Sequence, residues 1–317
     1  KSDAYSVQEG VRSPDGRLIA SASLDGRTVT VRVLSRSGRP FTYKSSFTYK
    51  GHSSLLSQLT GQQPNSVVSI VWSPDSRRVV STSSDGSVHM WTADGSWQPF
   101  IYKGSASFAF SFVYSPDGRR IAFASGDGTV QVWNTDGSGQ PLMYRGYFGN
   151  WSPDGRRIAL VSDDSSVQVW NTDGSGLHSI YKGNAPFTRV TRATYKGHAS
   201  LIGSIAWSPD GKRIASASDD GTVQVWNADS SGRLFTYSDH ACPVVAVAWS
   251  PDGKRISSAS NNVVNRDVTV RVWNADGSGL PSIYKGHTSP VLSLEWSPDG
   301  KWIASASQDG KHTCVGC

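Results

Sequence analysis

A histidine, an aspartate and a serine lie at spacings that could build a hydrolase site. His198 and Asp220, with Ser216 or Ser218 between them, have the residue types of a Ser-His-Asp triad. In such a triad the imidazole activates the hydroxyl and the carboxylate orients the imidazole. The chemistry to test first is therefore acyl transfer.

The same set occurs more than once along the chain. It recurs around His52 with Asp85 and around His240 with Asp267. A catalytic triad is needed once per active site, whereas a buried hydrogen-bond network is repeated with its structural unit. The recurrence favours a structural role, so we expect no catalytic residue and predict that the chain is not an enzyme.

Two further motifs could carry metal or redox chemistry. The loops NTDGSG and NADGSG hold one Asp each, whereas calcium needs six to eight oxygen ligands. Cys314 and Cys317 form a CxxC pair, which could be redox-active or half a metal site, but the only other thiol is Cys242. We interpret the loops as glycine turns and the pair as a surface tail, and we expect no metal and no cofactor.

Composition favours a β protein with many tight turns. Only Glu9 and Glu295 are Glu among the 25 acidic residues. Asp suits turns and caps, whereas Glu suits helices. The chain is 37% hydrophobic and 18% charged, which excludes a highly charged disordered protein. It has no run of about eighteen apolar residues, so no transmembrane helix is expected.

An internal repeat organises the 317 residues. The tripeptide Ser-Pro-Asp occurs seven times, at Ser13, Ser73, Ser115, Ser152, Ser208, Ser250 and Ser297. Around 195–232 the segments SLIGSIAW, RIASAS, TVQVW and RLFTY read as four strands, here called a to d, joined by turns such as SPDG. Four antiparallel strands every ~40–45 residues are typical of a β-propeller blade.

The repeat resembles the WD40 family. The residues that carry this resemblance are the pairs Gly51-His52, Gly197-His198 and Gly286-His287, the Asp of the b–c turn, and the Trp that ends strand c, at Trp91, Trp133, Trp170, Trp226 and Trp273. Asn or Thr replaces the Asp that usually follows this Trp. TolB-like propellers also carry Ser-Pro-Asp-Gly turns and are the alternative, which the Gly-His pairs disfavour.

The resemblance implies an all-β fold. We expect a seven-bladed β-propeller of four-stranded antiparallel blades, as a single domain over 1–317. In the last unit Val315 aligns with the strand-c Trp and no fourth strand follows. Two explanations stay open, a three-stranded last blade or a closing segment outside this sequence. An unpaired strand edge there would favour self-association.

The resemblance also implies a role for the recurring polar residues. In this family they form a buried hydrogen-bond relay with the strand-c Trp. The residues that it assigns to this relay are His52, Asp85, Trp91, His198, Asp220, Trp226, His240, Asp267 and Trp273.

In a propeller the d–a loops and b–c turns share one face, here called the loop face; the a–b and c–d connections share the other, the turn face. Insertions at 51–67, 183–197 and 261–266 all fall on the loop face. Because variable loops on a rigid scaffold carry function, we predict that this face binds partners. The candidate partner-binding residues are Leu55, Leu56, Gln58, Phe108, Tyr147, Phe187, Arg189, Arg192, Asn265 and Arg266.

Charge supports the same face. Next to the turn face we count twelve bases and twelve acids, so the surplus of +6 lies elsewhere. A Tyr-Lys/Arg-Gly motif recurs at the d–a junctions and forms a predicted basic rim, at Lys50, Lys103, Arg145, Lys182, Lys196 and Lys285. The rim fits an acidic protein partner or simply keeps the chain soluble.

The sequence therefore predicts a non-enzymatic scaffold for protein–protein interaction. The alternatives are a binder of polyanions or nucleic acid through the basic rim, and a regulatory or sensor propeller that belongs to a larger protein. Nucleic acid is the less favoured partner, because the chain shows diffuse basicity without a nucleic-acid-binding motif.

Overall fold

The computed structural model describes residues 7–23, 28–34, 43–50, 67–83, 87–95, 100–103, 109–181, 197–229, 231, 233–261, 268–309 and 312–316. Within these ranges the chain forms strands and turns, and no helix there is long and apolar enough to cross a membrane. The chain divides into two compact units, Lys1–Phe148 and Gly149–Cys317. Each unit is described by itself.

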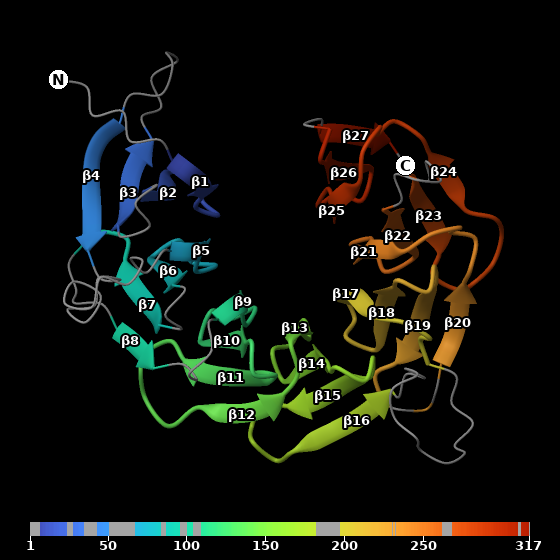
Figure 1. Ribbon diagram of the computed structural model, residues 1–317, viewed down its shortest axis with the longest axis horizontal. Coiled ribbons are helices and arrows are strands. Elements are labelled where there is room, and N and C mark those ends of the chain that lie inside the picture. Colours follow the sequence, from blue (N-terminus) through green and yellow to red (C-terminus); the bar gives the residue numbers. More distant parts are fainter. Residues whose placement is uncertain are drawn as a thin grey trace. The chain divides into compact units, whose positions relative to one another are not determined.

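The N-terminal unit contains three sheets of four strands each (Figure 1, blue to green). Its strands are β1 (Val7–Arg12), β2 (Leu18–Ser23), β3 (Thr28–Leu34) and β4 (Tyr43–Lys50); β5 (Val67–Trp72), β6 (Arg78–Ser83), β7 (Ser87–Thr92) and β8 (Phe100–Lys103); β9 (Ala109–Tyr114), β10 (Arg120–Ser125), β11 (Thr129–Asn134) and β12 (Leu142–Arg145).

The C-terminal unit contains three four-stranded sheets and a last sheet of three strands (Figure 1, light green to red). Its strands are β13 (Phe148–Trp151), β14 (Arg157–Val161), β15 (Val167–Asn171) and β16 (Leu177–Tyr181); β17 (Ile202–Trp207), β18 (Arg213–Ser218), β19 (Val223–Asn227) and β20 (Arg233–Tyr237); β21 (Val244–Trp249), β22 (Arg255–Ser260), β23 (Val270–Asn274) and β24 (Ser282–Tyr284); β25 (Val291–Trp296), β26 (Trp302–Ser307) and β27 (His312–Gly316).

Within each sheet every strand pairs with the next strand of the chain, so each sheet is formed by one continuous stretch of sequence. The pairing is antiparallel, as in β17–β18 and β18–β19. The predicted all-β fold of seven repeated sheets is confirmed, with three strands in the last sheet over the described residues. That the chain forms one domain over 1–317 stays a prediction.

The Ser-Pro-Asp-Gly turn forms through its own side chains. The Ser208 hydroxyl donates to Asp210 Oδ1 at 2.6 Å and accepts the Arg213 amide at 2.8 Å. Gly211 has φ 66°, a left-handed conformation that glycine adopts without a Cβ penalty. The same bonds recur at Ser250. There the serine hydroxyl and the Lys254 amide bond to the Asp252 carboxylate and lower its pKa. These turns therefore form from local sequence.

Neighbouring sheets of the C-terminal unit pack through small strand-b residues. Ala215 and Ala217 on β18 are fully buried and belong to one apolar cluster with Val244, Val247 and Trp249 on β21. Burying a valine such as Val244 or Val247 contributes about 1.5–3 kcal/mol. Alanine on strand b lets strand a of the next sheet approach closely.

The two sets of connections lie at opposite edges of a sheet. The Asp219 amide, in the b–c turn, donates to Leu201 O in the d–a loop at 2.9 Å. The Ala228 amide, after strand c, donates to Lys212 O in the a–b turn at 2.8 Å. Within this sheet, the d–a loop and b–c turn therefore share the loop face, and the other two connections share the turn face.

Candidate functional site

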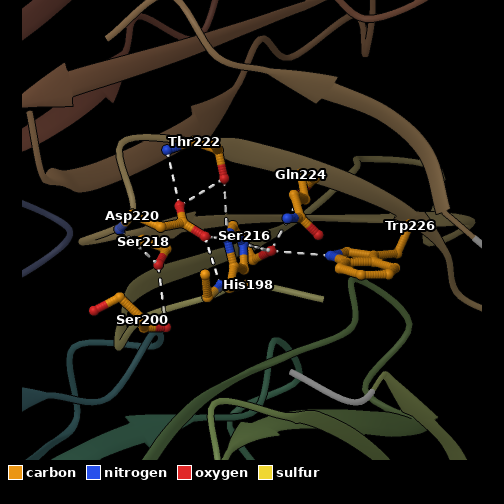
Figure 2. A network of polar contacts seen from close by, with 9 residues as sticks. His198, Ser200, Ser216, Ser218, Asp220, Thr222, Gln224 and Trp226 are labelled. Carbon is orange, nitrogen blue, oxygen red and sulfur yellow. Dashed lines mark hydrogen bonds and ion pairs between the residues drawn. The ribbon is translucent and has the colours of Figure 1, made fainter. Parts of the chain in front are cut away.

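A buried polar network lies beneath the loop face of the sheet β17–β20 (Figure 2). His198, in the d–a loop, places Nδ1 3.0 Å from Asp220 Oδ2 and Nε2 2.7 Å from Ser216 Oγ. The indole of Trp226 donates to the same Ser216 oxygen at 2.9 Å. The Ser218 hydroxyl bonds to backbone groups instead of the imidazole: it donates to Ser200 O and accepts the Asp220 amide, each at 3.2 Å.

The geometry assigns the protons of the network. The Asp220 carboxylate favours a proton on His198 Nδ1, so Nε2 accepts the Ser216 hydroxyl proton. Burial alone would raise the pKa of the Asp220 carboxyl, but hydrogen bonds with His198 and Thr222 outweigh it and hold that pKa well below its ordinary value. The carboxylate stays charged and orients the ring.

The same geometry does not suit a nucleophile. Ser216 is 0% exposed and His198 is 1% exposed. A catalytic hydroxyl must reach a substrate carbonyl in a pocket, whereas this hydroxyl is enclosed between an imidazole and an indole. The arrangement can satisfy buried polar groups and link the d–a loop to strands b and c.

A second network occupies the sheet β21–β24. His240 Nε2 lies 2.8 Å from Ser258 Oγ, and the Trp273 indole donates to that oxygen at 2.7 Å. Asp267, the predicted carboxylate of this set, lies outside the described residues. The imidazole, hydroxyl and indole repeat the arrangement around His198.

A third network lies in the last sheet. His287 was named from the sequence, but it was not grouped with Asp309 and Ser305. His287 places Nδ1 3.2 Å from Asp309 and Nε2 2.7 Å from Ser305 Oγ. The signal was available, because His287 precedes Asp309 by 22 residues, as His198 precedes Asp220. Val315 stands at the position of the strand-c Trp in this sheet.

In the N-terminal unit part of this arrangement is described. The Trp91 indole donates to Ser81 Oγ at 2.9 Å, but His52 and Asp85 lie outside the described residues. In the next sheet the Trp133 indole donates to the Gln131 side chain at 3.0 Å. The strand-c Trp thus finds a polar partner by a different route in each of these two sheets.

Contacts between a strand-b arginine and the next sheet were also missed. Arg213 places its Cζ 4.7 Å from the centre of the Trp249 ring and donates to Ala275 O at 2.8 Å and Gly253 O at 3.1 Å. Arg157 lies over Trp207 and Arg255 over Trp296 in the same way, at 5.0 Å and 4.8 Å.

The sequence signal for these contacts is the pair of basic residues that follows five of the seven Ser-Pro-Asp turns. An arginine that was predicted only to carry surface charge begins strand b at Arg78, Arg120, Arg157, Arg213 and Arg255. In the last sheet Trp302 stands at this position and is half exposed. The arginines of the C-terminal unit are therefore structural contacts between sheets as well as surface charge.

Few of the predicted partner-binding residues can be placed. Tyr147 is half-buried between β12 and β13, and its ring lies close to Gly128. Arg145 and Lys285 of the basic rim are exposed, and Lys50 and Lys103 end β4 and β8. The remaining predicted residues lie outside the described part of the chain, namely Leu55, Leu56, Gln58, Phe108, Lys182, Phe187, Arg189, Arg192, Lys196, Asn265 and Arg266.

Exposed carboxylates also line the connections of the loop face. They are Asp127, Asp163, Asp164, Asp219 and Asp239. The b–c turn Asp was predicted to be internal, but of the pair Asp219 and Asp220 only Asp220 contacts His198, and Asp219 is exposed. The described part of this face is thus mixed in charge.

Among the residues that the structure describes, no group of three or more His, Cys, Asp or Glu is arranged to hold a metal ion. Cys314 is exposed and Cys242 is buried. Cys317 is not among the described residues, so the CxxC pair stays untested.

The sequence itself matches a family model. The model of the WD domain, G-beta repeat, matches residues 43–92, 98–134, 150–171, 189–227, 231–274 and 279–311. These matches cover most of the chain and coincide with the repeated sheets and their strand-c Trp. The WD40 resemblance is confirmed over the TolB-like alternative, and the chain belongs to the WD40 family.

Proposed function

We propose that this protein is a non-enzymatic scaffold that binds protein partners through its loop face. WD40 repeats are generally protein-interaction scaffolds. The polar residues that resemble a hydrolase site are buried in the His198 network. This leaves recognition, rather than group transfer, as the role that the surface residues support.

One observation carries the choice of face. The turn face repeats the same Ser-Pro-Asp turn from sheet to sheet. The residue that follows the serine at the end of strand b, on the loop face, varies instead: it is Asp163 and Asp219 in two sheets, Asn261 in the next and Gln308 in the last. A surface that differs between otherwise similar repeats can present a different side chain at each position, which specific recognition needs.

The 183–196 insertion is the segment to test first. We expect a variant with this insertion shortened to lose a partner that the full chain captures. A matched control changes the turn face with Lys212→Ala and Leu280→Ser. The partner should stay bound to the control. Loss of the partner from the turn-face variant, with binding by the shortened variant intact, would overturn the choice of face.

The predicted acidic partner depends on the basic rim. Arg145 and Lys285 are exposed and support it. Lys182 and Lys196 lie outside the described residues, and of Lys50 and Lys103 only the backbone is described. Self-association through the three-stranded last sheet is a separate prediction. Sedimentation at increasing protein concentration tests it, and a concentration-independent monomer would contradict it.

A further inference from the structure

Strand a of three consecutive sheets in the C-terminal unit contains a β-bulge near its first residue. The register with strand b shifts between Ile202 and Ser204, between Val244 and Ala246, and between Val291 and Ser293. The extra residues are Gly203, Val245 and Leu292. A bulge leaves its extra residue unpaired and turns its side chain out of the regular alternation.

Apolar residues at and beside these bulges are exposed to different degrees. Leu292 is 56% exposed, Val245 is half-buried and Gly203 is exposed. Leu201, which directly precedes β17, is 62% exposed. Strands β17, β21 and β25 pack against one another in this order, and Gly203 lies against the Val245 backbone. We call Leu201, Gly203, Val245 and Leu292 the strand-a apolar cluster.

A negative charge lies beside this cluster. The Asp219 amide donates to Leu201 O at 2.9 Å, so its side chain branches from the backbone next to Leu201. Burial and the neighbouring Asp220 raise the pKa of the Asp219 carboxyl. Within the described ranges neither Asp219 nor Asp220 forms an ion pair with a lysine or an arginine.

We infer that the strand-a apolar cluster and Asp219 bind a partner segment in which an apolar residue lies next to a lysine or arginine. Apolar side chains of the segment would contact Leu201, Val245 and Leu292 along β17, β21 and β25, and the cation would pair with Asp219. This inference rests on the proposed function and specifies the chemistry of the partner. It differs from the acidic partner predicted for the basic rim, which lies at the strand-d side of the sheets.

The test uses the full chain and three labelled nine-residue peptides that alternate Leu with Arg, Leu with Glu, or Ser with Arg. We expect the Leu/Arg peptide to bind more tightly than the other two. The net charge of +6 would favour the Leu/Glu peptide in non-specific binding. A preference for Leu/Arg must therefore come from a local site.

Variants locate the site. Leu292→Ser or Leu201→Ser should weaken Leu/Arg binding about tenfold, because each removes an exposed apolar contact. Asp219→Lys should reverse the preference toward Leu/Glu. The matched controls are Leu280→Ser, a 92% exposed leucine on the turn face, and Asp163→Asn, at the equivalent turn position of the sheet β13–β16. Both should bind as the unchanged chain does.

Equal binding of the three peptides, no binding, or binding that is unchanged in Leu292→Ser and Asp219→Lys would overturn the inference. Such a result would leave the proposed function standing if the shortened 183–196 variant still loses its protein partner. Loss of peptide selectivity and loss of the loop-face partner are thus separate outcomes.

Discussion

In the sheet β17–β20 the Ser216 hydroxyl has two side-chain partners, His198 Nε2 at 2.7 Å and the Trp226 indole at 2.9 Å, and it also lies 3.4 Å from Gln224 O. A buried hydroxyl with both partners present is stabilised, whereas one that loses a partner costs free energy. At the scale of single residues, the network therefore contributes to stability. Two predictions follow from this at His198 and Asp220.

Replacing the imidazole tests the structural role. His198→Ala removes two buried hydrogen bonds and leaves a cavity, so the free energy of unfolding should fall by about 3 kcal/mol. Urea unfolding measures it, with Leu280→Ala as an exposed control that should change by less than about 0.5 kcal/mol. Unchanged stability together with loss of ester hydrolysis would instead indicate a catalytic histidine.

Acid should weaken the network through Asp220. The folded-state pKa of Asp220 lies below the unfolded value of about 3.9. Its contribution is complete above the unfolded pKa and is lost as pH falls through that value toward the folded one. The stability difference between the unchanged chain and Asp220→Asn should therefore shrink from pH 6 to pH 3, whereas that for Leu280→Ser should stay constant. A difference that grows in acid would contradict this sign.

At the scale of elements, contacts between neighbouring sheets depend on the arginine that begins strand b. Arg213 stacks on Trp249 and donates to two carbonyl oxygens of the next sheet. The planar guanidinium can do all three together, whereas an ammonium cannot. These contacts add to the apolar packing around Ala215 and Val247.

Arg213→Lys keeps the charge and should still lower the free energy of unfolding by about 1–2 kcal/mol. Lys212→Ala removes the neighbouring exposed charge and should change it by less than about 0.5 kcal/mol. Chemical unfolding of the two variants provides the comparison. Equal effects at the two positions would show that only net charge matters there.

One b–c turn carries a residue that its conformation disfavours. Ser165 has φ 58° where the equivalent residue in the sheet β17–β20 is Gly221, and its buried hydroxyl has no hydrogen-bond partner. Ser165→Gly should therefore stabilise the protein by about 1 kcal/mol. Ser76, with φ 60°, differs because its hydroxyl accepts the Asp15 amide at 3.0 Å. Ser76→Gly should gain less, and an equal gain in melting experiments would contradict the role of the hydroxyl.

At the scale of the whole molecule, the net charge of +6 is distributed over surfaces with different composition. The described loop-face connections expose five aspartates beside Arg145 and Lys285. Polyanion binding needs clustered bases and weakens steeply as salt is raised. The described surface supports binding of protein segments better than binding of polyanions.

We therefore expect the chain to elute from immobilised heparin below physiological salt. A cationic protein of similar size and a known heparin binder serve as column controls. Retention above physiological salt, abolished by Lys285→Ala and Arg145→Ala, would favour the polyanion alternative over the scaffold.

The sequence by itself determined the repeated unit. Each Ser-Pro-Asp-Gly turn is closed by bonds among residues at most five apart, such as Ser208, Asp210 and Arg213. Strand alternation and the 22-residue step from His198 to Asp220 are equally local to one sheet. Local chemistry of this kind can be read along the chain, so the all-β fold and the four strands of the repeat around His198 were predicted.

Only the tertiary structure decided what happens between sheets. Arg213 meets Trp249 because strand a of the next sheet packs on strand b, and the bulges at Val245 and Leu292 decide which apolar residues face solvent. Both depend on how two separately formed sheets fit, and a change of one residue in register reverses the direction of a side chain. That dependence on packing is why the repeat was evident from the sequence and the strand-a apolar cluster was not.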